Sequence, residues 1–163
     1  SSARLDAMPA PLSLPGMSWF EMFDAPVQLT GAVATATVTL LALWKGGVPE
    51  RIAALVSLAA FFLSPLAQQL GGLPQPLWGV AAVDATVLGV VTLLIWFYDR
   101  QWLIGAWAAE ALTLMCHAAK LADVTLLARG YVASLYILYF GFLASLAWGA
   151  FEASARRRKA ASA

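Results

Sequence analysis

The sequence predicts an all-α membrane protein: a polytopic transmembrane bundle of five helices, with a tight hairpin between the third and the fourth. Hydrophobic residues make up 61% of the chain and charged residues only 12%, about half the charge of an ordinary soluble domain. A hydrocarbon layer about 30 Å thick needs about 20 apolar residues per helical span, and five apolar runs of this kind can be counted. They are too long for strands and lack a strand's alternating pattern, which favours helices.

Short polar segments separate the five runs. The segment KGGVPER at 45–51 is expected to be a turn, and DRQ at 99–101 is all that separates the third run from the fourth. We expect three regions, namely a disordered or interfacial N-terminal segment (1–24), a transmembrane domain (25–152) and a basic cytoplasmic tail (153–163). The expected spans are Val27–Trp44, Ile52–Leu70, Trp78–Tyr98, Trp102–Leu121 and Tyr131 to about Phe151.

The positions of lysine and arginine predict the orientation, because loops rich in them tend to stay in the cytoplasm. The side that carries KGGVPER, DRQ and the RRRK sequence at 156–159 has seven basic residues, against three on the opposite side. The N-terminus is therefore expected outside and the C-terminus in the cytoplasm. With a formal net charge of +1, the RRRK sequence is expected to contact anionic lipid rather than nucleic acid.

The composition excludes several kinds of site. A single cysteine, Cys116, rules out an internal disulfide and a cysteine-cluster metal site, and a single His117 rules out bis-histidine haem ligation within one chain. The sequence has no phosphate loop, dinucleotide fingerprint, HExxH or nucleophile elbow, so an enzyme is the least favoured class. No cofactor is predicted outright, but His117 leaves open one axial bond to a haem or chlorin, or a hydrogen bond to a quinone.

The candidate site residues are the polar groups inside the spans. A charge at the bilayer centre costs at least about 2.5–3.5 kcal/mol, so such residues normally face protein or a wet cavity. In the fourth run the polar positions are spaced by three, four and three residues, which places them on one helix face. The candidates are Asp84 in the third run and Glu110, Thr113, His117 and Lys120 in the fourth.

The hairpin places two of these residues at the same height. Asp84 lies sixteen residues before Arg100, at the centre of the turn, and His117 lies seventeen after it, so both stand about 24–26 Å from the turn. We therefore predict that Asp84 pairs with His117, which would favour a protonated imidazole.

Glu110 differs, because it lies only ten residues from the turn and no cation of the hairpin is level with it. We expect Glu110 to be protonated and to donate a hydrogen bond, either in a proton relay or in plain helix association. Its candidate partners in the other spans are Thr35, Thr37, Thr39, Ser57, Ser64 and Ser145.

Two further patterns concern packing. Gly141, Ser145 and Gly149 recur every four residues along the fifth run and predict a smooth face for a second helix, in this chain or in another subunit. Pro65 in the second run predicts a helix kink, because proline cannot donate a backbone hydrogen bond.

The stretches LLALWKGGVPERIAAL (40–55), WGVAAVDA (78–85) and LMCHAAKLAD (114–123) resemble segments of small, uncharacterised multi-span proteins of bacteria. The resemblance implies location in a bacterial inner membrane. It implies no activity and no site residues.

Three classes of function remain open. The first is an accessory or structural subunit of a larger membrane complex, which the small size, the small-residue face and the lack of a catalytic constellation favour. The second is a proton-linked transporter, channel or sensor that uses Asp84, Glu110 and His117. Because five spans without an internal repeat make a small carrier, this second class is expected to be a homo-oligomer. The third is a haem, chlorin or quinone binder that uses His117.

Overall fold

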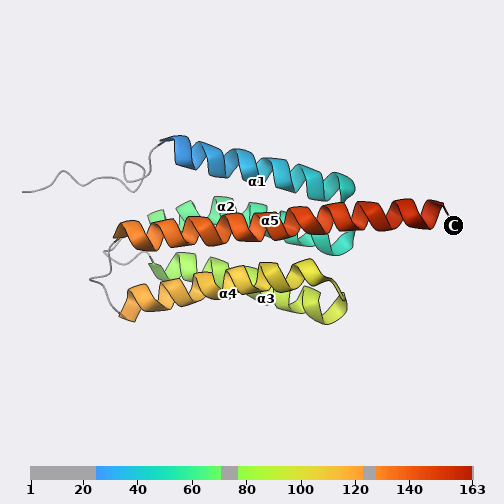
Figure 1. Ribbon diagram of the computed structural model, residues 1–163. Coiled ribbons are helices and arrows are strands. Elements are labelled where there is room, and N and C mark those ends of the chain that lie inside the picture. The colour runs from blue at the N-terminus through green and yellow to red at the C-terminus, as the bar shows by residue number, and fades with distance from the viewer. Residues whose placement is uncertain (1–24, 71–76, 123–127, 163) are drawn as a thin grey trace, which may run out of the picture. The chain divides into compact units, whose positions relative to one another are not determined.

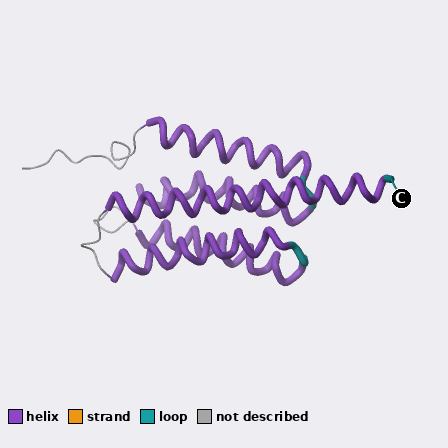
Figure 2. The backbone as a smooth tube through the Cα atoms, in the orientation of Figure 1, coloured by secondary structure: helices purple, strands orange, loops and turns teal. Residues whose placement is uncertain are grey.

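The computed structural model describes residues 25–70, 77–122 and 128–162, all of them in helices or in the short turns between helices (Figures 1 and 2). The predicted N-terminal segment, 1–24, lies outside the described residues. Five helices are present, which confirms the all-α class and the hairpin between the third helix and the fourth. They are α1 (Ala25–Lys45), α2 (Val48–Leu70), α3 (Leu77–Phe97), α4 (Gln101–Ala122) and α5 (Ala128–Ala161).

The first turn is shorter than the sequence predicts. Only Gly46 and Gly47 are non-helical, and α2 already begins at Val48. Pro49 is compatible with the first helical turn, where a missing N–H group removes no helical bond. At Gly46 a Cβ atom would lie 2.3 Å from the carbonyl oxygen of Ala42, so only glycine fits this reversal. The segment KGGVPER is thus a two-residue turn followed by the start of a helix.

Three helical segments in the described part of the chain are long and apolar enough to cross a membrane: Val48–Ala67, Trp78–Phe97 and Gly130–Ala161. The apolar part of α1, Leu29–Lys45, is shorter, and α4 carries the polar residues described above. The chain is therefore a transmembrane helical bundle. Membrane crossing by α1 and α4 stays a prediction.

The described residues from Ala34 onward form one compact unit, to which residues 25–33 do not belong. Within the larger unit α3 packs on α2 and α4, and α5 packs mainly on α4 and to a smaller extent on α2. We call the end with the turns at 46–47 and 98–100 the turn end. The apolar core lies in the half nearer to it, around Leu103, Phe142 and Leu146.

The outer surface of the helices is strongly apolar. Large side chains such as Leu40, Phe62, Trp96 and Ile137 are exposed. Apolar surface spread over several helices is unusual for a water-soluble monomer and suits contact with lipid.

The three small residues predicted as a packing face on α5 behave differently from one another. Gly149 lies against the indole of Trp102 on α4, where a Cβ atom would come within 2.6 Å of Nε1. Ser145 faces Gly105 of α4, where a Cβ would lie 2.7 Å from the serine Oγ. Gly141 has open space beside it. The close approach of α4 and α5 therefore depends on Gly105 and Gly149.

The helix α2 continues through Pro65 to Leu70. The predicted kink at Pro65 stays a prediction. The basic residues at 156–159 extend α5 as helix to Ala161.

These contacts predict opposite responses of two glycines on one helix. Gly149→Ala should lower the free energy of unfolding by about 1–3 kcal/mol, because the new methyl group meets a rigid, buried indole. Gly141→Ala should be neutral, or stabilising by up to about 1 kcal/mol through helix propensity. Unfolding of the two variants in detergent micelles measures the difference, and equal responses would contradict the packing described.

Candidate functional site

The candidate site is centred on the only histidine of the sequence. His117 on α4 is 1% exposed, and its two ring nitrogens contact two other helices. Nε2 lies 2.7 Å from Oδ2 of Asp84 on α3, and Nδ1 lies 2.7 Å from the hydroxyl of Tyr131 on α5. The contact predicted from the height of Asp84 and His117 in the hairpin is present. Tyr131 completes a cluster of three side chains, which we call the Asp–His–Tyr triad.

The chemistry of the partners decides where the hydrogens lie. A carboxylate can only accept, so an ionised Asp84 requires Nε2 of His117 to donate. In a neutral imidazole Nδ1 then accepts, and the hydroxyl of Tyr131 donates to it. If the imidazole gains a proton, Nδ1 donates instead and the phenol oxygen accepts. Rotation of one hydroxyl therefore adapts the triad to either charge state of His117.

Glu110 lies on the same helix, seven residues nearer the turn end. Its side chain is 8% exposed, and its carboxyl is within electrostatic range of that of Asp84. Within the described part of the chain, the buried atom Oε2 has no hydrogen-bond partner. Leaving such a group unpaired costs about 1–3 kcal/mol, so Glu110 is retained at a cost in stability.

A group of three hydroxyls lies near Glu110. The hydroxyls of Thr35 on α1 and Tyr139 on α5 are 2.5 Å apart, and that of Ser57 on α2 also bonds to Tyr139. The Tyr139 hydroxyl is within electrostatic range of the Glu110 carboxyl. Thr35 and Ser57 were among the candidate partners of Glu110, but here they bond to Tyr139, which the sequence analysis did not single out.

The remaining candidates on α4 are Thr113 and Lys120. Thr113 donates its hydroxyl hydrogen to the carbonyl oxygen of Ala109 in its own helix. Lys120 is half-buried one turn beyond His117. The polar residues predicted on one face of α4 thus behave differently. Glu110 and His117 are buried against other helices, whereas Thr113 bonds to the backbone of its own helix.

A second buried carboxyl, Glu50, lies at the turn end, and the sequence analysis missed it. It is 1% exposed, and its two oxygens accept from the backbone N–H of Gly47 (2.8 Å) and from the indole N–H of Trp102 (2.9 Å). The first bond is the glutamate half of a capping box, with Gly47 as N-cap and Glu50 as the third residue of α2. A proline in a first helical turn followed by glutamate was the available signal.

The basic end of α5 contacts the same turn. Arg157 donates to the carbonyl oxygen of Gly46 (3.1 Å) and to that of Lys45. Arg156 pairs with Glu152 one turn earlier and lies 4.0 Å from Oε1 of Glu50. At least two of the four basic residues therefore bind the chain itself.

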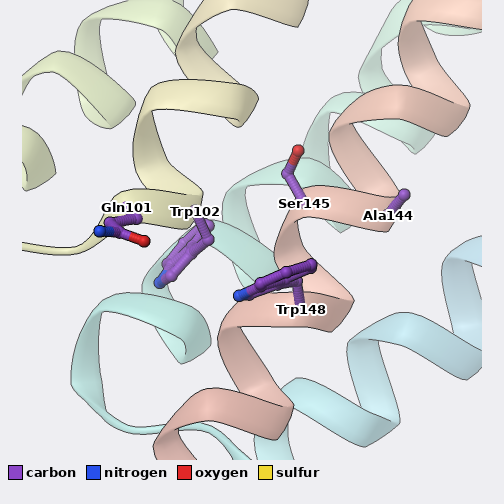
Figure 3. Close-up of a pocket in the computed structure, with 5 residues that line it drawn as sticks. All are labelled: Gln101, Trp102, Ala144, Ser145 and Trp148. Atoms are coloured by element: carbon purple, nitrogen blue, oxygen red, sulfur yellow. The ribbon is translucent and has the colours of Figure 1, made fainter.

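A shallow hollow of about 350 Å³ lies between the start of α4 and the middle of α5 (Figure 3). The indoles of Trp102 and Trp148 project from these two helices beside it. The hollow contains neither the triad nor Glu110. Its lining residues are Gln101, Trp102, Ala144, Ser145 and Trp148.

The geometry does not suit the cofactors considered for His117. Both ring nitrogens are engaged by side chains of the chain, so an axial bond to a haem or chlorin iron, or a hydrogen bond to a quinone, would require Asp84 or Tyr131 to be displaced. No group of three or more potential metal ligands occurs among the described residues.

Comparison with family models, with curated proteins and with solved structures finds no match for this chain.

The environment of Glu50 yields a stability prediction. Glu50→Ala removes the acceptor for two donors, one of them a buried indole N–H, at about 1–3 kcal/mol for each. Glu50→Gln keeps a carbonyl oxygen and should lose less. The midpoint temperature of thermal unfolding in detergent should therefore be highest for the parent, lower for Glu50→Gln and lowest for Glu50→Ala. Three equal midpoints would show that the Glu50 carboxyl does not stabilise the fold.

Proposed function

We propose that the chain is a proton-linked membrane protein, a transporter, channel or sensor, in which the Asp–His–Tyr triad and Glu110 bind and pass protons. The observation that carries this proposal is the buried imidazole of His117, bonded through one nitrogen to a carboxyl and through the other to a phenol. Ionisable groups inside a membrane are costly and commonly belong to ion or proton pathways.

Glu110 favours a role in proton transfer over a purely structural role in holding the helices together. A purely structural role requires hydrogen bonds between the helices, and the triad alone would provide them between α3, α4 and α5. The unpaired oxygen of Glu110 adds no hydrogen bond between helices. The carboxyl can, however, bind and release a proton without the breaking of a hydrogen bond at that oxygen. It lies about 10 Å nearer the turn end than His117 and within electrostatic range of Asp84, and is the next ionisable group for a proton that leaves the triad.

The proton steps follow from the bonds. A proton that reaches the Tyr131 oxygen allows its own hydroxyl hydrogen to pass to Nδ1 of His117, which leaves the phenol neutral and forms an imidazolium. The Asp84 carboxylate stabilises that cation and can take the hydrogen from Nε2. Asp84 is then neutral and can pass the proton toward Glu110, and a change of tautomer returns His117 to its first state.

For the cellular setting we infer five spans in a bacterial inner membrane, with the N-terminus outside and the turn end in the cytoplasm. The positive-inside rule supports this, because Lys45, Arg51, Arg100 and the basic end of α5 lie at the turn end. The triad would then lie in the outer half of the bilayer.

Proton flux into liposomes tests the proposal. With the purified protein, a pH-sensitive dye inside and an imposed pH gradient, Glu110→Gln and His117→Ala should each lower the flux at least ten-fold. Thr113→Val is the matched control on the same helix and should leave the flux unchanged, because the Thr113 hydroxyl bonds to its own backbone. Unchanged flux in the first two variants, or no flux in the parent under gradients of either sign, would refute the proposal.

A second candidate is an accessory subunit or a homo-oligomer. Its support is Gly141, a small residue of the predicted packing face that has open space beside it and could accommodate a helix of another chain. Native mass analysis after extraction in mild detergent should then show a larger species, and Gly141→Leu should dissociate it. A reproducible monomer would exclude this candidate.

A further inference from the structure

The hollow between the start of α4 and the middle of α5 has no part in the proposed proton path. Two indoles, those of Trp102 and Trp148, stand beside it (Figure 3). Two small residues, Ala144 and Ser145, and the exposed side chain of Gln101 also line it. Because Trp148 is 67% exposed, the hollow opens on the outer surface of the bundle.

The hollow begins at the level of the lipid headgroups. The membrane-spanning part of α3 ends at Phe97, so the turn that follows it lies at the boundary between hydrocarbon and headgroups. Gln101 is the first residue of α4 after this turn, and indoles such as those of Trp102 and Trp148 favour this boundary. Farther along α5 toward the bilayer centre, Gly141 has open space beside it. No side chain at that position closes the hollow on the hydrocarbon side.

An arginine without a counter-ion precedes the hollow in the chain. Arg100 is followed directly by Gln101 and is half-buried. Its side chain forms no hydrogen bond or ion pair with the described residues, and its Nε atom is buried. By contrast, Arg156 and Arg157 at the same end bond to acceptors of the chain itself. A partly buried charge is costly unless it is paired, so Arg100 calls for an anion from outside the chain.

We infer that the hollow is a binding site for one anionic phospholipid. One acyl chain lies between Trp102 and Trp148, and the phosphate is the counter-ion of Arg100. Guanidinium groups bind phosphate through two parallel hydrogen bonds, and basic pockets between membrane helices are typical sites for anionic headgroups. The inference does not depend on the proposed function, because none of these residues belongs to the triad and Glu110 is not among them.

Size and charge favour a lipid over a helix of a second copy. A volume of about 350 Å³ is at the lower end of the range for ligand pockets, about 300–1,000 Å³. A helix with its side chains is about 10–12 Å wide, so it can rest on the hollow but not enter it, whereas a single acyl chain can. A second copy with the same orientation would also place its own basic turn end beside Arg100 and would not neutralise it.

Native mass spectrometry in detergent with defined lipids tests the headgroup part of the site. The probes are phosphatidylglycerol, which is anionic, and phosphatidylethanolamine with the same acyl chains, which is zwitterionic. For the first lipid bound, the parent should prefer phosphatidylglycerol at least five-fold in dissociation constant. Arg100→Gln should remove this preference. Arg51→Gln is the matched control, because it removes one exposed charge at the same end, and it should stay within two-fold of the parent.

A second substitution tests the acyl-chain part. Ala144→Phe places a ring in the hollow, and because Ala144 is exposed the core is not disturbed. Both lipids should then bind at least five-fold more weakly. Leu93→Phe, at an exposed position of α3, is the control and should bind both lipids as the parent does.

Thermal unfolding supplies a readout without mass spectrometry. A ligand that binds only the folded state raises the midpoint temperature. Phosphatidylglycerol should therefore raise the midpoint of the parent more than phosphatidylethanolamine does, and this difference should vanish in Arg100→Gln and persist in Arg51→Gln.

Four results would overturn the inference. Equal affinity of the parent for the two lipids would show that no anion is selected. Equal losses in Arg100→Gln and Arg51→Gln would show that only total charge matters. Full lipid binding in Ala144→Phe would show that the hollow holds no acyl chain. A dimeric parent that Ala144→Phe converts to a monomer would show that a second copy covers the hollow.

Discussion

Hydrocarbon offers no hydrogen bonds, so a polar side chain inside a membrane bundle has to find its partner in the protein. In this chain several such bonds join different helices, whereas hydroxyls such as those of Thr113 and Ser145 bond to the backbone of their own helix. His117 joins α4 to α3 and α5, Tyr139 joins α5 to α1 and α2, and Glu50 joins the start of α2 to α4 through Trp102. The polar bonds lie at three heights along the bundle, and they fix how the helices are paired and rotated. Glu110 differs from these three residues, because its buried Oε2 has no partner among the described residues, as is also true of Oε2 of Glu152.

Trp102 shows how packing and hydrogen bonding depend on each other. Its ring fills the space left by Gly149, and its N–H group reaches the buried carboxyl of Glu50. The indole can reach Glu50 only because α5 offers no side chain in its way. The Glu50–Trp102 bond and the apolar packing around Leu103 thus lie in the same half of the bundle.

Much of the fold follows from the sequence, because the spans are apolar and the turns between them short. The Asp84–His117 contact was predictable from the rise of two helices that share one turn. Tyr131 was not, because the rotation of α5 depends on packing against α4, which no spacing within one helix reveals. Glu50 was missed because KGGVPER was interpreted as a turn throughout, although its glutamate occupies the third position of a helix that begins at Val48. Gly141 resembled Gly149 in sequence and differs from it only in what lies opposite.

The central claim is that the His117 imidazole bridges a carboxyl and a phenol inside the membrane. Because the chain has one histidine, ¹⁵N-histidine labelling followed by solid-state NMR in lipid bilayers observes this ring alone. We expect two distinct ring nitrogens, one whose signal moves in Asp84→Asn and the other whose signal moves in Tyr131→Phe. Signals that neither substitution moves would show that the imidazole is not held between these two residues. The proposed proton pathway would then lack its first proton-binding group.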